Sequence, residues 1–168
     1  MFENTVDFKI VERFAENCKT DILIGFLSGR EHVPTLHKDE SGNYKTYNGK
    51  SPEGMETLET AELAKTLSYG GAGIPPRPFL IEGLEEKKDV ILSEMKKQTQ
   101  RVHDGLKPNW DKVGTMAVGA VQEFVRGDYY RSHVPNSQKT IDYKGSDKPL
   151  IDGGDLIGSL TYVKTGGE

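Results

Sequence analysis

The sequence predicts an α+β fold in which a small, mostly antiparallel sheet is packed by two or three helices, with extended loops or arms. Three observations predict this class. Apolar residues recur with a period of about 3.6 over residues 57–69 and 109–126, as in core-facing helices. Short alternating or β-branched runs lie near both ends of the chain. Turn-forming residues are abundant, with 19 glycines and 8 prolines.

The composition indicates one domain with a modest core. A length of 168 residues suits a single domain over residues 1–168, and a hydrophobic fraction of 35% limits the apolar surface that can be buried. The net charge of −4 disfavours a sequence-independent nucleic-acid binder, which needs a basic footprint. The single cysteine, Cys18, excludes an intramolecular disulfide framework and favours a reducing compartment. No apolar run reaches transmembrane length, and the N-terminus lacks a signal-peptide pattern.

Three segments are predicted as strands. Residues 5–12 alternate apolar and polar side chains, which indicates a half-buried strand, although a helical period fits the same stretch. Residues 21–28 form a short apolar run with β-branched residues that ends at a Ser-Gly pair, as expected for a buried strand. Residues 156–163 alternate again and follow the turn at 152–154.

Three segments are predicted as helices. Residues 58–69 form the first, which the glycines at 70 and 71 end. Residues 80–104 carry only a thin apolar stripe, so this helix is either solvated on most faces or packed against a neighbouring subunit. Residues 109–126 have the most regular period of the chain. Gly114 and Gly119 lie inside that last helix, where glycine costs about 1 kcal/mol relative to alanine, and they indicate the close approach of another backbone.

Two long polar segments connect these elements. Residues 29–56 contain an Asn-Gly pair, the strongest hairpin signal, and are predicted to form a protruding hairpin or loop. Residues 128–155 are dominated by turn residues and mixed charge, and are predicted to form an ordered arm or loop.

A proline-rich segment, Ile74-Pro75-Pro76-Arg77-Pro78-Phe79-Leu80, lies between the first two predicted helices. Its prolines fix φ and push their predecessors to extended conformations, so the segment should be a stiff rod. Arg77 places a guanidinium in the middle of the rod, and Phe79 and Leu80 end it with an apolar anchor. The rod either stiffens the start of the next helix or contributes to an interaction with a partner.

The sequence offers no constellation typical of catalysis. His32 and His37 lie in a polar loop without a cysteine or carboxylate at metal-ligand spacing. Asp152 and Asp155 flank two glycines, which matches no EF-hand spacing and favours an ordinary turn. We therefore expect a protein that is not an enzyme and has no cofactor, catalytic residue or metal ligand.

Three stretches together resemble a known family. They are Leu63 to Gly70 leading to the proline-rich segment, Val118 to Gly127, and Pro135 to Ile141 followed by Lys144 to Val163. In this order they resemble the neck, or tail-completion, proteins of tailed bacteriophages and prophages, also called head–tail joining or virion morphogenesis proteins. The resemblance covers roughly residues 58–163 and leaves 29–56 unmatched. Gly153 stands where the family usually has threonine.

The resemblance implies a virion structural protein that joins the tail to the capsid portal. Such proteins form cyclic homo-oligomers, a hexamer by family analogy, and contact portal or adaptor and tail tube or tail terminator proteins. Genomic DNA would pass through the ring, and the chain would lie in the host cytoplasm during assembly. The arm over residues 128–155 would be ordered by an adjacent subunit. The residues expected at such interfaces are Arg77, Phe79, Leu80, Tyr129, Tyr130, Lys144, Asp147 and Lys148.

Arg77 is the sharpest of these expectations. Its planar guanidinium can bind a neighbour's carboxylate through two hydrogen bonds. On this hypothesis, Arg77→Ala would leave the fold intact and prevent assembly.

Two functions from other classes remain open at this stage. A small metal-dependent hydrolase would use His32, His37, Asp152 or Asp155 and would purify with a stoichiometric metal ion. A DNA-end binding protein would retard DNA in a salt-dependent manner, which the net acidity disfavours.

Overall fold

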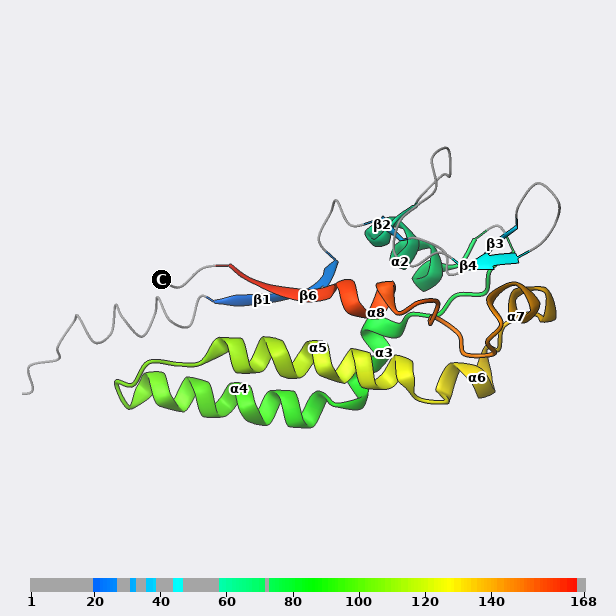
Figure 1. Cartoon of the computed structure of the whole chain (residues 1–168). Coiled ribbons are helices and arrows are strands. Elements are labelled where there is room, and N and C mark those ends of the chain that lie inside the picture. The colour runs from blue at the N-terminus through cyan, green and yellow to red at the C-terminus, as the bar shows by residue number, and fades with distance from the viewer. Residues whose placement is uncertain are drawn as a thin grey trace, which may run out of the picture.

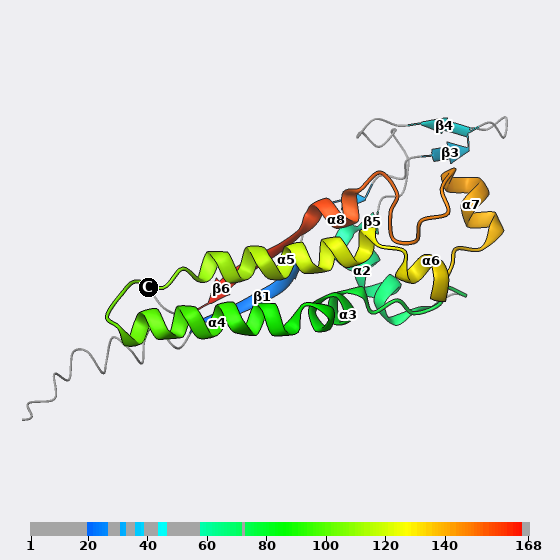
Figure 2. The same cartoon turned by 90° about the horizontal axis from the view of Figure 1, so that it is seen from below.

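The protein is elongated, and a helical hairpin forms its long axis (Figure 1). The computed structural model describes residues 20–26, 31–32, 36–38, 44–46, 58–71 and 73–165. Helices α4 (Lys88–His103) and α5 (Trp110–Arg126) run antiparallel to each other, with the 104–109 connection at one end of the molecule. The view from below shows the same two helices side by side, with a β ribbon behind them (Figure 2).

The described strands form three short antiparallel ladders. Strands β1 (Asp21–Phe26) and β6 (Leu160–Thr165) pair from Asp21↔Thr165 to Phe26↔Leu160. The other ladders join β2 (Glu31–His32) to β5 (Leu58–Glu59) and β3 (Leu36–Lys38) to β4 (Tyr44–Thr46). The predicted α+β class with a small antiparallel sheet is confirmed. The predicted strand at 5–12 lies outside the described residues.

Five further helices surround one end of the long hairpin. They are α2 (Thr60–Tyr69), α3 (Phe79–Glu86), α6 (Tyr129–His133), α7 (Gln138–Lys144) and α8 (Asp155–Ser159). The segment 128–155 thus contains two short helices, and Ser137 caps α7 by accepting a hydrogen bond from the Thr140 backbone N–H.

The predicted strand at 156–163 is wrong in its first half. Residues 155–159 form α8, and the strand begins only at Leu160. Leu156 and Ile157 are both buried although they are consecutive, which a helical turn allows and the two-residue alternation of a strand does not. Gly154, with φ 90°, provides the left-handed residue that starts this turn.

The single helix predicted over residues 80–104 is also wrong, because it is interrupted at Lys87. That residue has φ −107° and ψ 13°, and it separates α3 from α4. Helix α3 packs very closely on α5 through Gly83, where an added Cβ would lie 2.9 Å from Val121 Cα. The break lets α3 make this close contact while α4 follows α5 along its length.

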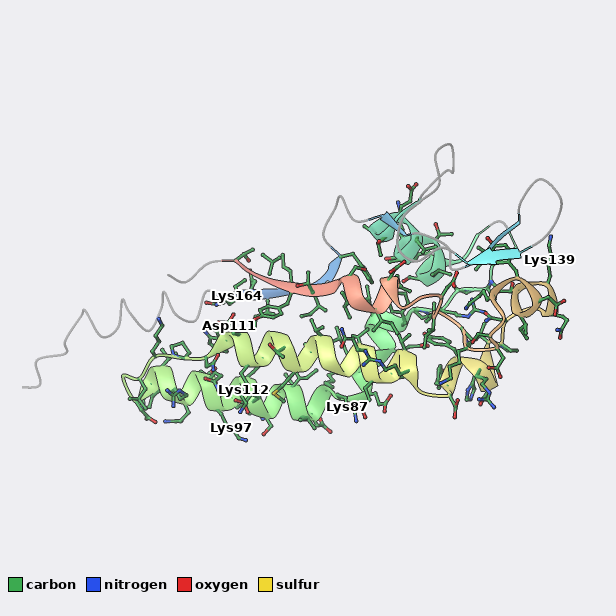
Figure 3. The ribbon with its side chains drawn as sticks, in the orientation of Figure 1. Lys87, Lys97, Asp111, Lys112, Lys139 and Lys164 are labelled. Atoms are coloured by element: carbon green, nitrogen blue, oxygen red, sulfur yellow. The ribbon has the colours of Figure 1, made fainter. Side chains whose placement is uncertain are left out.

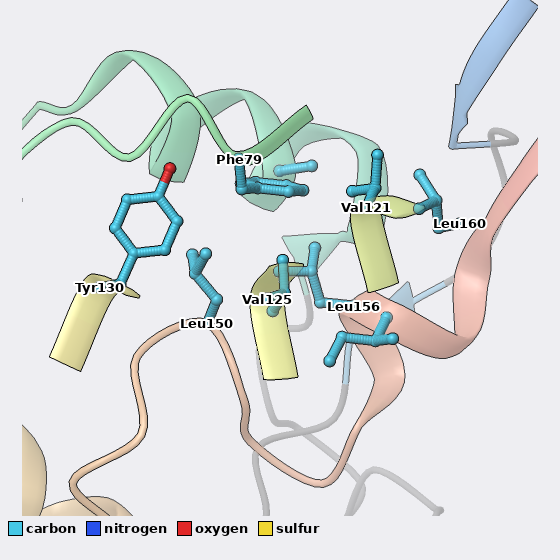
Figure 4. Close-up of a cluster of buried hydrophobic side chains, with 9 residues drawn as sticks. Phe79, Val121, Val125, Tyr130, Leu150, Leu156 and Leu160 are labelled. Carbon is cyan, nitrogen blue, oxygen red and sulfur yellow. The ribbon is translucent and has the colours of Figure 1, made fainter. Parts of the chain in front are cut away.

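The core lies where α2, α3, the second half of α5 and α8 meet (Figure 4). Phe79 is 1% exposed and its ring meets Phe26 of β1 edge to face, with centroids 6.2 Å apart. The other buried members are Ala64, Val121, Val125, Tyr130, Leu150, Leu156, Ile157 and Leu160. Side chains from both the proline-rich segment and the 128–155 segment therefore belong to the chain's own core.

Of the two glycines inside α5, only Gly114 has a close neighbour. A Cβ on Gly114 would lie 2.4 Å from the ring of Tyr162 on β6, and the Tyr162 hydroxyl donates to Asp111 at 2.9 Å. The expected close approach is thus found, made by an aromatic ring rather than by backbone. At Gly119 the expectation is wrong, because an added Cβ would meet nothing within 4 Å.

This difference predicts opposite effects for two alanine substitutions in one helix. Gly114→Ala should destabilise the protein by about 1–2 kcal/mol, because displacing Tyr162 outweighs the gain in helix propensity. Gly119→Ala should stabilise it by up to about 1 kcal/mol, since the site is open. Urea unfolding followed by circular dichroism measures both. Equal shifts of the same sign would show that Tyr162 moves aside freely.

Candidate functional site

Arg77 joins the proline-rich segment to the segment after α6. Its side chain is 5% exposed. Nε and Nη2 donate to the carbonyl oxygen of Val134 at 3.1 and 3.0 Å, and Nη2 also donates to that of Pro135 at 3.2 Å. Burial lowers the pKa of Arg77 from its ordinary value, and the nearby Tyr130 opposes this shift. The guanidinium therefore staples two segments that are far apart in the sequence.

Three residues expected at a subunit interface are instead used inside the chain. Arg77 binds backbone carbonyls of its own chain, whereas the sequence-based hypothesis placed it against a neighbour's carboxylate. Phe79 is a core residue. Tyr130 is 3% exposed and its hydroxyl donates to Glu82. Burial, then the hydrogen bond and charge of Glu82, raise the pKa of Tyr130 far above its usual range.

The stapled segments enclose a cavity of about 270 Å³. Helix α2 contributes apolar side chains, and the rod, α7 and the turn before α8 complete the walls. Arg77, Lys144 and Asp152 are the ionisable groups of the lining. Leu150, whose φ of 61° is the only left-handed non-glycine backbone among the described residues, forms part of the wall. The cavity is thus mainly aliphatic with two cations and one carboxylate.

A second, wider hollow of about 730 Å³ lies between α3 and the end of α5. Two aromatic rings, Phe124 and Tyr129, lie in its wall with centroids 5.1 Å apart. The ring of His133 stacks on Tyr129 at 4.4 Å. The remaining wall is carboxylate-rich, and these residues are Glu82, Glu85, Glu86, Glu123 and Asp128. Three of them also pair with neighbouring cations: Glu123 with Lys87, Glu85 with Lys88 and Asp128 with Arg131. We call this hollow the acidic cleft.

The opposite end of the helical hairpin carries several lysines, among them Lys97, Lys112 and Lys164, which Figure 3 labels beside Asp111. Lys96 and Lys107 are exposed there and make no ion pair with the described residues. Other cations of this end are held by carboxylates: Lys112 contacts Glu94 at 2.9 Å, and Lys164 contacts Asp111 at 2.8 Å. Among the residues that the structure describes, the cations of this end are Lys96, Lys97, Arg101, Lys107, Lys112 and Lys164, which we call the basic tip.

A buried polar network fixes the geometry of this tip. Glu94 is 5% exposed and accepts from Lys112 and from Gln98, the latter at 2.6 Å. Gln98 in turn accepts from the backbone N–H of Asn109, and Asn109 caps α5 by accepting from the Lys112 N–H. The network therefore ties α4 to the first turn of α5. The inward face of α4 follows helical spacing and consists of Ile91, Glu94, Gln98 and Val102. Two of these residues are polar, so the sequence shows only a thin apolar stripe.

The hydrogen bonds from Lys112 and Gln98 hold the pKa of Glu94 below its ordinary value. A depressed carboxyl pKa stabilises the fold above the unfolded-state pKa, and this contribution disappears as the pH falls through the lowered value. The stability difference between the wild type and Glu94→Gln should therefore be largest at neutral pH and shrink below about pH 4. Thermal unfolding of both proteins from pH 7 to pH 3 tests this. A difference in melting temperature that is the same at every pH would contradict it.

The β1–β6 ribbon presents a partly apolar outer face. Leu23 and Val163 are cross-strand partners and are 58% and 43% exposed. Among the described strands, β1 and β6 pair only with each other, so each has one edge without a described partner. Unpaired edges and exposed apolar pairs are features through which strands add to neighbouring sheets.

The remaining predicted interface residues differ in where they lie. Leu80 is half-buried and packs against the core, whereas Tyr129 is exposed at the cleft. Lys144 lines the cavity and donates to the Lys148 carbonyl at 2.9 Å. Asp147 and Lys148 are exposed, and Asp147 pairs with Arg131 at 3.2 Å. Glu94, Gln98 and the basic tip were not predicted as a group.

Neither protein-family models nor curated proteins nor solved structures match the chain significantly. Within the part of the chain that the structure describes, no three His, Cys, Asp or Glu side chains are grouped so as to hold a metal ion. None of the described helices is long and apolar enough to cross a membrane.

Proposed function

We propose that the chain is a structural subunit of the head–tail connector of a tailed phage, where copies form a ring that joins the tail to the capsid portal. The observation that carries the proposal is the polarity of the helical hairpin, with an acidic cleft at one end and a basic tip at the other. Opposite charges at opposite ends favour head-to-tail contact between copies, and head-to-tail contacts close into rings. The resemblance over residues 58–163 supplies the place of the ring in the virion.

The surface between the two ends fits the same proposal. Val90, Leu92 and Met95 of α4 are 56%, 41% and 39% exposed, although α4 buries a glutamate and a glutamine against α5. Apolar side chains left outside while polar ones face inward are expected where a neighbouring copy covers the helix. Tyr129 and Phe124 add aromatic faces in the acidic cleft on which a lysine or arginine can rest.

Charge reversal tests the head-to-tail contact directly. Lys96→Glu with Lys107→Glu should reduce assembly at least about tenfold, because the tip would repel the cleft of the next copy. Glu86→Lys with Asp128→Lys should do the same from the other side. All four changes combined should restore assembly, since the ends become complementary again. Sedimentation velocity at low and high salt measures the ring.

The control is Lys139→Glu, which makes the same charge change on exposed α7 and should leave assembly unchanged. Failure of the fourfold variant to recover, with its fold intact, would contradict the cleft–tip contact. Mass spectrometry of purified tailed particles tests the wider proposal, because a connector subunit must be present in them. Its absence from such particles would end that proposal.

A further inference from the structure

We propose that the cavity between α2, the proline-rich rod and α7 is a binding site for a short aliphatic carboxylate, held by Arg77 and Lys144. This inference is independent of the proposed ring, because the cavity shares no lining residue with the acidic cleft.

Arg77 is presented to the cavity in a fixed orientation. Its Nε and Nη2 are occupied by the carbonyls of Val134 and Pro135, which orient the planar group. Nη1 makes no hydrogen bond with any described residue. An anchored guanidinium with two N–H donors left over is suited to an anionic oxygen.

The charge balance of the lining favours an anion. Lys144 is half-buried, and burial lowers its pKa while Asp152 opposes this shift and Arg77 adds to it. Among the described residues, two cations and one carboxylate line the cavity, so one further negative charge would balance them. A carboxylate that accepts from Arg77 and lies near Lys144 makes charge-assisted hydrogen bonds out of bulk water, where such bonds are strong.

The walls and the size select the rest of the ligand. Leu63, Leu67, Ile74, Leu150 and Leu156 give the cavity an aliphatic lining, which disfavours a fully hydrated anion such as inorganic phosphate. The volume of about 270 Å³ is close to the lower limit of typical small-molecule sites, about 300 Å³. A branched aliphatic acid with the size of a leucine side chain fits both properties. It can be a free acid or the C-terminal residue of a peptide.

Paired probes separate charge from shape. Sodium 4-methylpentanoate represents the free acid and N-acetyl-leucine the peptide end, and their neutral partners are 4-methylpentanamide and N-acetyl-leucinamide. Calorimetry with the full chain should give a Kd of about 1 mM or tighter for at least one acid, with its amide at least about tenfold weaker. The acid that binds more tightly identifies the source. Amide NMR shifts should concentrate at residues lining the cavity.

Two variants of the cavity wall complete the test. Lys144→Gln should weaken binding of the acid several-fold, and Thr140→Trp, which fills the cavity from α7, should abolish it. Lys139→Gln removes a neighbouring lysine that does not line the cavity and should bind as the wild type does. Binding of neither acid up to 10 mM (about the limit of such titrations), or equal binding of acid and amide, would overturn the inference. So would binding that Thr140→Trp leaves unchanged while the variant remains folded.

Discussion

Replacing Phe79 by alanine is expected to lower the free energy of unfolding by about 3–5 kcal/mol, the largest effect of any single substitution proposed for this chain. The ring is 1% exposed, packs against Phe26, and belongs to the same core cluster as Val121 and Leu156. Its removal would leave a cavity between α3, α5 and β1 that the proline-stiffened backbone before it cannot collapse into. Urea unfolding followed by circular dichroism measures the loss.

Ile81 on the same helix provides the matched control. It is 64% exposed, so Ile81→Ala should change the unfolding free energy by no more than about 0.5 kcal/mol. A loss at position 79 as small as that at position 81 would mean that Phe79 is not a core residue. The same outcome would return it to the interface role that the sequence suggested.

Arg77→Met is expected to destabilise the protein by about 2–4 kcal/mol. Methionine preserves much of the length of the side chain but removes every donor, which leaves the carbonyls of Val134 and Pro135 without their partner. An acceptor left unsatisfied away from water costs about 1–3 kcal/mol, and Val134 is half-buried whereas Pro135 is exposed. Amide hydrogen exchange should show the largest loss of protection around the rod and the 134–137 connection.

Arg126→Met is the comparison, because Arg126 is exposed at the end of α5 and should have little effect. The sequence-based hypothesis expected the opposite for Arg77, namely an intact fold with failed assembly. If Arg77→Met has the same urea midpoint of unfolding as the wild type, the result would support the sequence-based hypothesis. It would also show that the hydrogen bonds from Arg77 to Val134 and Pro135 do not stabilise the fold.

The elements that sequence analysis located well are those whose signal is local. The period of α5 reports which face is buried, and α5 and β1 are both found close to their predicted bounds. The expected burial of β1 is wrong, because none of its residues is fully buried and Leu23 is 58% exposed. The division between α3 and α4 was not predicted, because it depends on how closely Gly83 approaches α5. Likewise, the helical turn α8 at the start of the last predicted strand was not predicted, because it depends on the burial of both Leu156 and Ile157.

The candidate sites were harder to predict, because their partners are distant in the sequence. Arg77 was predicted to lie at a subunit interface, but its acceptors are main-chain carbonyls of its own chain 57 and 58 positions away, which carry no side-chain signal. The carboxylates of the acidic cleft come from α3 and from the region around the end of α5, so they form a group only after folding. A count of charges along the sequence does not reveal that acidic and basic side chains gather at different ends of the folded chain.

The ribbon has a consequence for how the protein is made. Strand β1 leaves the ribosome early, while β6, its only described partner, is the last described element to be synthesised. A two-stranded ribbon is at best marginally stable without support, and this one rests on α5 through Tyr162 and Gly114. The nascent chain therefore exposes β1 without this partner until β6 has been synthesised, which is when an unpaired apolar strand is most prone to aggregate.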